Sequence, residues 1–355
     1  MKDIYILGIE SSCDETSMSI VKNGREVLSN VISSQIDIHK IYGGVVPEIA
    51  SRKHIDNINY VFDEAMKKSK MSITDIDCIA VTYGPGLVGA LLVGLSYAKA
   101  LSLSSNKKLI AVNHIEGHIA ANYITSKELK PPFLALIVSG GHTNLVLVED
   151  YLKFKIYGST RDDAVGESFD KVARSLGLSY PGGPKIEEKA QFGEKDKYIF
   201  PRANIKEAPY DFSFSGLKSS VINTINNLKQ NYISENKLYD LIVKDITLDN
   251  QSICDISKAF QDSIIDTLVS KTIELANHLD IENVAICGGV SANKTICKAL
   301  SDELKKYDKK LFCPEFKYCT DNAAMIASAG YFRYLHKDFA DMSINADANL
   351  KFKGN

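Results

Sequence analysis

The sequence predicts an α/β fold built from two similar, duplicated lobes around a central cleft. A buried strand, a polar turn and a second strand occupy residues 4–21, and the same plan returns at residues 132–148. A strand that leads through a glycine turn into a helix occupies residues 77–90 and again residues 282–293. Alternating strands and helices are typical of α/β domains. The separation between the strand–turn–strand unit and the strand–glycine–helix unit is roughly twice as long in the second half as in the first. We therefore expect an insertion within residues 159–253.

Apolar runs and turn residues give the order of elements in the first half. Strands are expected at residues 4–9, 17–21, 26–32, 76–82 and 109–112, and a helix at residues 47–68 that starts at Pro47. The run Gly84–Ala90 opens another helix, made of small residues. Either the backbone amides at its start face an anion, or its glycines only allow close packing of helix and sheet.

The second half combines strands with long helical segments. Strands are expected at residues 132–138 and 144–148 and from residue 282, with helices at 162–176, from 212–218 onward and at 255–278. Residues 229–250 carry charges of both signs and are expected to form a solvated surface segment. Thr320 or Asp321 is the expected N-cap of the C-terminal helix. The polar tail from Asp341 onward is expected to be loosely ordered.

Composition argues against several classes of protein. The chain has 355 residues, 45% hydrophobic and 24% charged, which suits one large or two ordinary globular domains. Its net charge of −2 argues against a strongly basic nucleic-acid binder, so any such contact needs a local patch or a partner. Seven cysteines without a CxxC pair indicate reduced thiols in a cytosolic protein. There is no signal-peptide pattern, and the longest apolar run, residues 86–100, is too short and too interrupted for a membrane span.

Two histidines, His114 and His118, stand four residues apart after a short apolar strand. On a helix, positions i and i+4 share one face, so both imidazoles can reach one metal ion. The alternative is that one histidine packs or caps while the other is exposed. A zinc-peptidase helix would place a glutamate directly after the first histidine, whereas Glu116 comes two residues later and points away from the histidine face.

Two glycine turns follow strands of the second half. They are Ser139-Gly140-Gly141 and Gly288-Gly289. Glycine has no Cβ, so backbone amides in such turns can approach phosphates closely. Together the two turns favour a nucleotide or an acyl-adenylate as ligand, although glycines are common in turns of every kind.

Four carboxylates are candidates for chemistry, and each has a structural alternative. Asp14 and Glu15 either orient or deprotonate a nucleophile or are ordinary turn residues. Asp170 either accepts a hydrogen bond from the ligand or pairs with Arg174 on a solvated helix face. From spacing alone, Asp321 is better explained as a helix cap, although it could complete a His–His–Asp metal site with positions left open for substrate.

Ten motifs in order closely resemble those of the bacterial tRNA threonylcarbamoyladenosine transferase family, once called O-sialoglycoprotein endopeptidase. They are GIESSCDET, YGGVVPEIASRKH, GPGLVGALLVG, VNHIEGHIAA, VSGGHT, GESFDKVAR, YPGGP, DFSFSGLK, GGVSANK and CTDNAAMIA. The resemblance covers about residues 4–336 and implies the fold shared by actin, sugar kinases and heat-shock chaperone ATPases (the ASKHA fold). The lobes expected on this basis are residues 1–130 with the C-terminal helix 322–340, and residues 131–321 with a helical insertion at about 160–252.

The resemblance also implies a reaction. A threonylcarbamoyl group would move from threonylcarbamoyl-AMP to the exocyclic amine of the adenosine 3′ of the anticodon, with release of AMP. The acceptors would be tRNAs that read codons starting with A. A cytoplasmic location and two partners are implied as well: a smaller paralogue of the same fold and a P-loop ATPase.

Site residues follow from the same resemblance. The implied metal ligands, for one divalent ion per subunit with Fe²⁺ ahead of Zn²⁺, are His114, His118 and Asp321. The resemblance thus outweighs the cap interpretation of Asp321. The implied adenylate-binding positions are Ile137, Val138, Ser139, Gly140, Gly141, Asp170, Gly183, Glu187 and Asn293. At Glu187 many relatives carry aspartate, which puts that contact in doubt. Asp14 and Glu15 match carboxylates that assist the transfer.

Three other functions compete with this one. A metallopeptidase would need a water-activating carboxylate beside the metal, and Glu116 is misplaced for that role. An ATPase or small-molecule kinase of the same superfamily would keep the nucleotide turns but would have no need for paired histidines. A noncatalytic scaffold would be expected to lose His114, His118 and Asp321, and all three are present.

Overall fold

The computed structural model of the chain describes residues 2–238 and 240–352. The strands are β1 Tyr5–Glu10, β2 Glu15–Lys22, β3 Glu26–Ser34, β4 Cys78–Gly84, β5 Lys108–Asn113, β6 Phe133–Val138, β7 Thr143–Asp150, β8 Lys153–Ser159, β9 Asn283–Cys287 and β10 Lys310–Phe312. The α-helices are α1 Ile36–His39, α2 Pro47–Ser69, α3 Val88–Ser105, α4 His114–Thr125, α5 Val165–Ser175, α6 Gly182–Ala190, α7 Ser215–Glu235, α8 Asn250–His278, α9 Lys294–Lys305 and α10 Ala323–Leu335.

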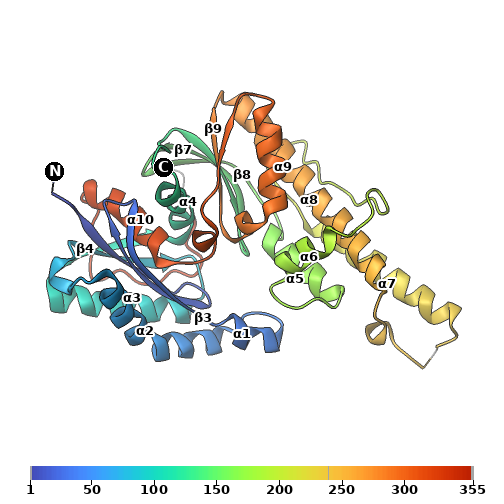
Figure 1. The fold of residues 1–355 in the computed structure, drawn as a ribbon, viewed down its shortest axis with the longest axis horizontal. Coiled ribbons are helices and arrows are strands. Elements are labelled where there is room, and N and C mark those ends of the chain that lie inside the picture. Colours follow the sequence, from blue (N-terminus) through green and yellow to red (C-terminus); the bar gives the residue numbers. More distant parts are fainter. Residues whose placement is uncertain (1, 239, 353–355) are drawn as a thin grey trace.

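The described residues form two five-stranded sheets with the same topology. Their strand orders are β3-β2-β1-β4-β5 and β8-β7-β6-β9-β10. In each sheet three antiparallel strands are continued by two parallel ones. This repeated order confirms the duplication that the sequence predicts, and Figure 1 shows the two sheets with their helices.

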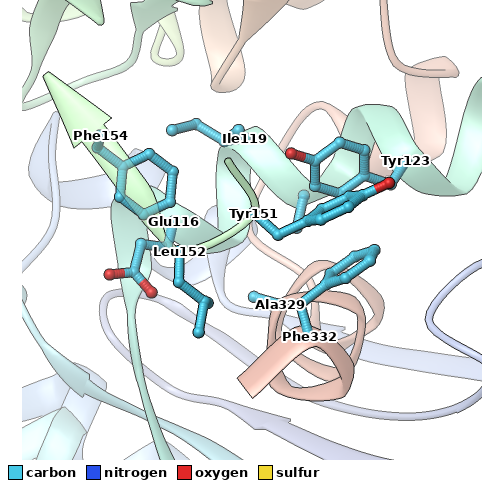
Figure 2. Close-up of a pocket in the computed structure, with 9 residues that line it drawn as sticks. Glu116, Ile119, Tyr123, Tyr151, Leu152, Phe154, Ala329 and Phe332 are labelled. Atoms are coloured by element: carbon cyan, nitrogen blue, oxygen red, sulfur yellow. The ribbon is translucent and has the colours of Figure 1, made fainter. Parts of the chain in front are cut away.

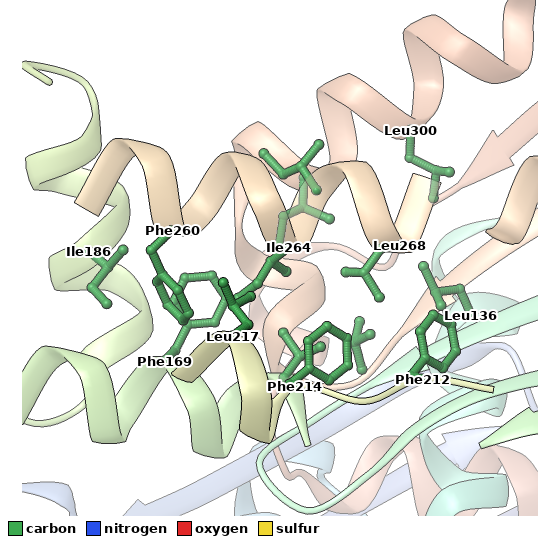
Figure 3. Packing of buried hydrophobic residues seen from close by; sticks show 14 of the residues in the cluster. Leu136, Phe169, Ile186, Phe212, Phe214, Leu217, Phe260, Ile264, Leu268 and Leu300 are labelled. Carbon is green, nitrogen blue, oxygen red and sulfur yellow. The ribbon is translucent and has the colours of Figure 1, made fainter. Parts of the chain in front are cut away.

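The helical insertion lies in the second half, as expected. Helices α5, α6, α7 and α8 connect β8 to β9, whereas α1 and α2 make the matching connection between β3 and β4. In Figure 1, α7 lies far from the first sheet, whereas α5 lies nearer to it and its Arg174 donates to the carbonyl of Gly43 in the first lobe. Phe169 of α5, Leu217 of α7 and Phe260 of α8 pack into one buried core (Figure 3), so the insertion is part of the second lobe's core.

Helix α10 lies unusually close to the first sheet. A Cβ added at Gly8 of β1 would come within 2.2 Å of the carbonyl oxygen of Ala323 and within 2.8 Å of the backbone nitrogen of Ala327. Helix α10 also packs against α4, the helix that carries the two histidines. Small residues therefore set the distance between the first sheet and the segment that precedes α10, where Asp321 lies.

Aromatic side chains fill the space between α4, α10 and the turn from β7 to β8. The rings of Tyr151 and Phe332 are stacked with centroids 4.0 Å apart, and Tyr123 packs edge-on against both (Figure 2). The cavity beside them has a volume of about 10 Å³. A space of that size holds about one water molecule at most. This region therefore packs α4 and α10 together with the turn from β7 to β8, and it is not a ligand site.

Several element boundaries differ from the predictions. Helix α8 begins at Asn250 instead of Asp255, because the side chain of Asp249 caps it by accepting from the amide of Ser252 at 2.9 Å. Helix α7 continues to Glu235, so the segment predicted as residues 229–250 is helical at its start. Strand β4 is shifted by two residues and spans Cys78–Gly84.

The polar tail is packed and not loosely ordered as predicted. The amide of Ala340 donates to the carbonyl of Leu109 at 2.8 Å, and the amide of Asp347 donates to that of Tyr83 at 2.8 Å. Ile344 and Ala346 pack against the core of the first lobe. Hydrogen bonding to strand ends, which composition does not reveal, holds this segment in place.

The glycines at the start of α3 serve close packing. A Cβ at Gly86 would lie 2.5 Å from the carbonyl oxygen of Ser12, and one at Gly89 would lie 2.3 Å from the hydroxyl of Ser51. By length and composition alone α3 is long and apolar enough to cross a membrane, contrary to the expectation from residues 86–100. One such helix is a weak indication, because core helices pass the same test.

Substitution of Gly8 by alanine is expected to lower the free energy of unfolding by about 1–3 kcal/mol, because the new methyl group would force α10 away from β1. The matched control is Gly216→Ala on α7, where a Cβ has no neighbour within 4 Å. That change should leave stability unchanged or raise it by about 1 kcal/mol or less. Thermal and denaturant unfolding would measure both, and equal stability of Gly8→Ala and the parent chain would contradict this packing argument.

Candidate functional site

The junction of β5 and α4 fixes the two histidines. Asn113 ends the strand and caps the helix, since its side chain accepts from the amide of Ile115 at 2.8 Å. His114 is therefore the first residue of α4, and His118 follows one turn later on the same face. The two rings meet edge to face, with centroids 4.6 Å apart. Both side chains are buried, so the prediction that one of them is exposed does not describe this fold.

Asp321 lies beside both histidines. Its Oδ1 is 3.4 Å from Nε2 of His114 and 3.3 Å from Nε2 of His118. The cap of α10 is Asn322, whose side chain accepts from the amide of Met325 at 3.1 Å. The predicted capping by Thr320 or Asp321 is thus wrong by one or two residues, which leaves the Asp321 carboxylate free to face the histidines.

These three residues are the one group of three potential metal ligands found within residues 2–238 and 240–352. Two atoms bound to one ion at about 2.1 Å each lie roughly 3.0–3.4 Å apart, as Oδ1 does from each Nε2 here. Nδ1 of His118 is buried without a hydrogen-bond partner, and its buried Nε2, 3.3 Å from Oδ1 of Asp321, makes no hydrogen bond of regular geometry. Such a nitrogen costs about 1–3 kcal/mol unless something binds it. The donor set therefore fits a divalent metal ion.

The electrostatics of the group favour a cation. Burial opposes ionisation of Asp321, yet His114 and His118 hold the pKa of its carboxyl well below the ordinary value. Burial likewise disfavours the charged form of His114, but Asp321 and Glu10 together raise its pKa well above the ordinary value. A metal ion at this place would replace the proton that these carboxylates otherwise attract.

Glu10 belongs to the site and was not singled out from the sequence. Its carboxylate is fully buried at the end of β1, and Oε2 lies 3.1 Å from Nδ1 of His114. The backbone amide of Ser12 donates to Oε1 at 2.5 Å, and the hydroxyl of Thr82 donates to Oε2 at 2.6 Å. The sequence feature that could have pointed to Glu10 is a glutamate at the end of an otherwise apolar strand.

His142 is a second residue to which the sequence analysis gave no role. Burial, reinforced by the nearby His114 and His118, lowers the pKa of His142 to about 4. Its backbone closes the turn after β6, because the amide of Ser139 donates to the carbonyl of His142 at 2.9 Å. This neutral imidazole of the second lobe therefore adjoins the histidine pair of the first.

Asp14 lies in the turn between β1 and β2, Glu15 is the first residue of β2, and both are buried. The hydroxyl of Ser34 donates to Glu15 at 3.0 Å. Burial, followed by the carboxylates of Asp14 and Asp321, raises the pKa of Glu15 well above its ordinary value. Glu15 is thus close enough to Asp321 for the charges to interact, as a cleft carboxylate requires.

The glycine turns of the second lobe leave open space. A Cβ at Gly140, Gly141, Gly183 or Gly289 would meet nothing within 4 Å. By contrast, the side chains of Ile137 and Val138 are fully buried in β6. Any ligand contact of those two residues must therefore come from their backbone, as expected of a strand end that leads into a phosphate-binding turn.

The remaining predicted ligand contacts already have structural partners. Asp170 accepts from the amide of Gly182 at 2.7 Å, and burial raises the pKa of this carboxyl. Glu187 accepts from the amide and the hydroxyl of Thr295, each at 3.0 Å. Asn293 caps α9 through the amide of Ile296. All three place polar groups at the starts of α6 and α9, where amides of helix N-termini point outward.

Glu116 is not available as the base of a peptidase. Its carboxylate pairs with Arg333 of α10, with oxygen–nitrogen distances of 2.6–3.0 Å. It lines the small cavity of Figure 2, on the aromatic side of α4. The side chain that a metallopeptidase would need at the metal is thus held by an ion pair elsewhere.

Comparison with known proteins agrees with this geometry. The family model described as tRNA N6-adenosine threonylcarbamoyltransferase matches residues 26–328. The enzyme of that name from Caldicellulosiruptor saccharolyticus is 52% identical over 343 residues, 97% of each chain. The one from Clostridioides difficile is 51% identical over 351 residues, 99% of each chain.

Solved structures support the fold. The HypF protein of T. kodakarensis aligns with a TM-score of 0.61 at 14% identity, over 95% of this chain and 48% of that one. A phosphate- and nucleotide-bound full-length HypF aligns with a TM-score of 0.59 at 13% identity, over 94% and 46%. These likenesses concern the fold alone and agree with the expected actin-like architecture. The matching family model and the near full-length relatives establish that the chain belongs to the tRNA N6-adenosine threonylcarbamoyltransferase family.

Proposed function

We propose that the chain transfers a threonylcarbamoyl group from threonylcarbamoyl-AMP to the exocyclic amine of the adenosine 3′ of the anticodon. The acceptors are tRNAs that read codons starting with A, the product is threonylcarbamoyladenosine (t6A), and AMP leaves. The observation that carries this proposal is the buried His114–His118–Asp321 group beside the open glycine turns of the second lobe. Such a site can hold a metal ion and an adenylate together.

A carbamoyl carbon reacts slowly until negative charge on its oxygen or on the leaving phosphate is stabilised. A divalent ion held by His114, His118 and Asp321 would supply that stabilisation as a Lewis acid. Iron suits this donor set ahead of zinc in our proposal. The backbone amides at Gly140 and Gly141 would bind the phosphate, with no side chain in the way.

The adenosine amine is a weak nucleophile and must lose a proton. Asp14 and Glu15 are the carboxylates that we assign to this step, since both lie where the turn meets β2, beside Asp321. General-base assistance is worth about 10²–10⁴ in rate. A raised pKa makes the Glu15 carboxylate a stronger base in its ionised form, and a cation held beside Asp321 would favour that form.

Partners and location follow from the same proposal. With a net charge of −2, the chain needs clustered cations from elsewhere for tight tRNA binding, and we assign these to a smaller paralogue and a P-loop ATPase. An enzyme that acts on tRNA with these partners would work in the cytoplasm.

We place the smaller paralogue on the outer face of α2 and α3. A groove of about 440 Å³ lies there, and Ile55, Leu92 and Tyr97 line part of it. The exposed fractions of Ile55 and Leu92 are 62% and 40%, which is unusual for adjacent apolar side chains. A partner of the same fold would carry the same pair of helices, so the two apolar faces can pack against each other.

The His118→Ala variant is expected to lose metal and transferase activity. The assay combines purified protein, both presumed partners, threonylcarbamoyl-AMP and unmodified tRNA, with detection of t6A by mass spectrometry. The control is His336→Ala, at an exposed histidine outside the site, which should keep full activity. Full activity of metal-free His118→Ala would refute the metal assignment.

The Glu15→Gln variant is expected to lower turnover by about 10²–10⁴ while it raises stability at neutral pH. A folded-state pKa above the unfolded value means that Glu15 adds stability at pH values below the unfolded pKa, and that this stability is lost as pH rises through the folded pKa. Glutamine removes that loss. Denaturant unfolding between pH 4 and 8 in the presence of a chelator would show a flatter profile for the variant. Identical profiles would contradict this account of Glu15.

The Leu92→Asp variant is expected to weaken binding of the smaller paralogue by about tenfold or more, because it places a charge in an apolar contact. Leu103→Asp, on α3 but outside the groove, is the matched control. Calorimetry with the purified partner would measure both affinities. If both variants lose the same affinity for the partner, or if neither loses any, the partner does not bind at this groove.

A further inference from the structure

Glu10 is a buried carboxylate, held by hydrogen bonds, that contacts His114 from the side away from Asp321. It ends β1, and its side chain has no exposed surface. Three neighbours surround its carboxylate: the amide of Ser12 at 2.5 Å, the hydroxyl of Thr82 at 2.6 Å and Nδ1 of His114 at 3.1 Å. Because β1 and β4 are paired in parallel, Thr82 stands beside the end of β1. Two strands of the first sheet therefore fix this carboxylate in place.

An ionised carboxylate only accepts hydrogen bonds, so a group within reach must donate to it. Nδ1 of His114 then carries the proton, and the lone pair of Nε2 points toward Asp321, 3.4 Å from its Oδ1. The hydroxyl of Ser12 is also near Nδ1, at 3.2 Å, but it can donate or accept and does not select a tautomer. Asp321 draws a proton onto Nε2 when no ion is bound, so Glu10 sets the tautomer in the state in which an ion lies between Nε2 and Asp321.

His118 provides the contrast within the same site. Its Nδ1 is buried without any hydrogen-bond partner, so no carboxylate supports this histidine on the side away from Asp321. The two histidines thus differ in their support, although they stand one turn apart and face the same carboxylate. A change at Glu10 should act on His114 and leave His118 unaffected.

We propose that Glu10 is a positioning residue of the metal site, which holds the proton on Nδ1 of His114 and thereby presents Nε2 to the ion. Glu10 neither binds the ion nor touches substrate in this role. The inference rests on the metal site proposed above and adds a residue of the first sheet to it. Carboxylates that orient a ligating histidine typically change metal affinity by about 10–100-fold when they are replaced.

The Glu10→Gln variant tests this role with little change in shape. The amide of Ser12 requires an oxygen at one side-chain position, so the NH₂ group of glutamine must face Thr82 and His114. That NH₂ group would donate to Nδ1 and leave the proton on Nε2, where it blocks the ion. Competition with a chromogenic chelator for Fe²⁺ and for Zn²⁺ should show affinity about 10–100-fold below that of the parent chain.

Thr82→Val is the matched control, because it removes one donor to the carboxylate and keeps the carboxylate itself. Its metal affinity should fall by less than that of Glu10→Gln. Circular dichroism and thermal unfolding establish that each variant is folded. If Glu10→Gln does not fold, Glu10→Asp takes its place, since the shorter side chain keeps the charge but withdraws it from Nδ1.

Nitrogen-15 spectra of histidine-labelled, zinc-loaded protein give a second readout that does not depend on activity. The chain has seven histidines, so their signals can be assigned by substitution. The parent chain should show a protonated Nδ1 and a zinc-bound Nε2 at His114, and Glu10→Gln at the same zinc concentration should show Nε2–H there.

The outcomes separate the two proposals. If the parent chain binds metal and Glu10→Gln binds it equally, with the same His114 tautomer, the role of Glu10 is refuted and the metal site stands. If the parent chain binds neither metal ion, both the site and the inference fail. Weaker binding together with the changed His114 tautomer supports both.

Discussion

The contact between α4 and α10 is the constraint on which the site depends. His114 and His118 belong to the first of these helices, and Asp321 immediately precedes the second. The two helices pack against each other, and α10 lies on the first sheet at a distance that Gly8 makes possible. The metal-ligand geometry is therefore set by backbone packing of small residues and not by local sequence spacing.

In both sheets the functional groups lie at or just after the carboxyl ends of strands. Glu10 ends β1, Asn113 ends β5 directly before His114, and the Ser139 turn follows β6. In α/β folds the carboxyl ends of parallel strands form the edge where ligands bind, because helix N-termini and short loops gather there. Duplication of the sheet thus produces two such edges. One supplies the histidines and carboxylates, and the other supplies glycine turns with open space beside them.

The site concentrates negative charge in a buried place. Glu10 and Glu15 are buried, and Oδ1 of Asp321 lies within 3.4 Å of Nε2 of both histidines. Buried charges are stable only when they are paired or bind metal. Hydrogen bonds satisfy Glu10, but burial and like charge raise the pKa of Glu15. These buried carboxylates would attract a cation. Without one, their mutual repulsion and desolvation lower the stability of the folded chain.

The sequence determined the fold class and the family by itself. Repeated strand–turn–strand units and ordered motifs are local features, and the observed sheets and relatives confirm both predictions. It also supplied His114 and His118 as a candidate pair, because a spacing of four residues places both side chains on one face of a helix. Tertiary structure decided the rest. Asp321 lies about two hundred residues from that pair, and from spacing alone a cap was the better explanation until packing placed it between two imidazoles. Glu10 and the ordered tail were missed because hydrogen bonds to distant strands, which no local pattern encodes, give them their roles.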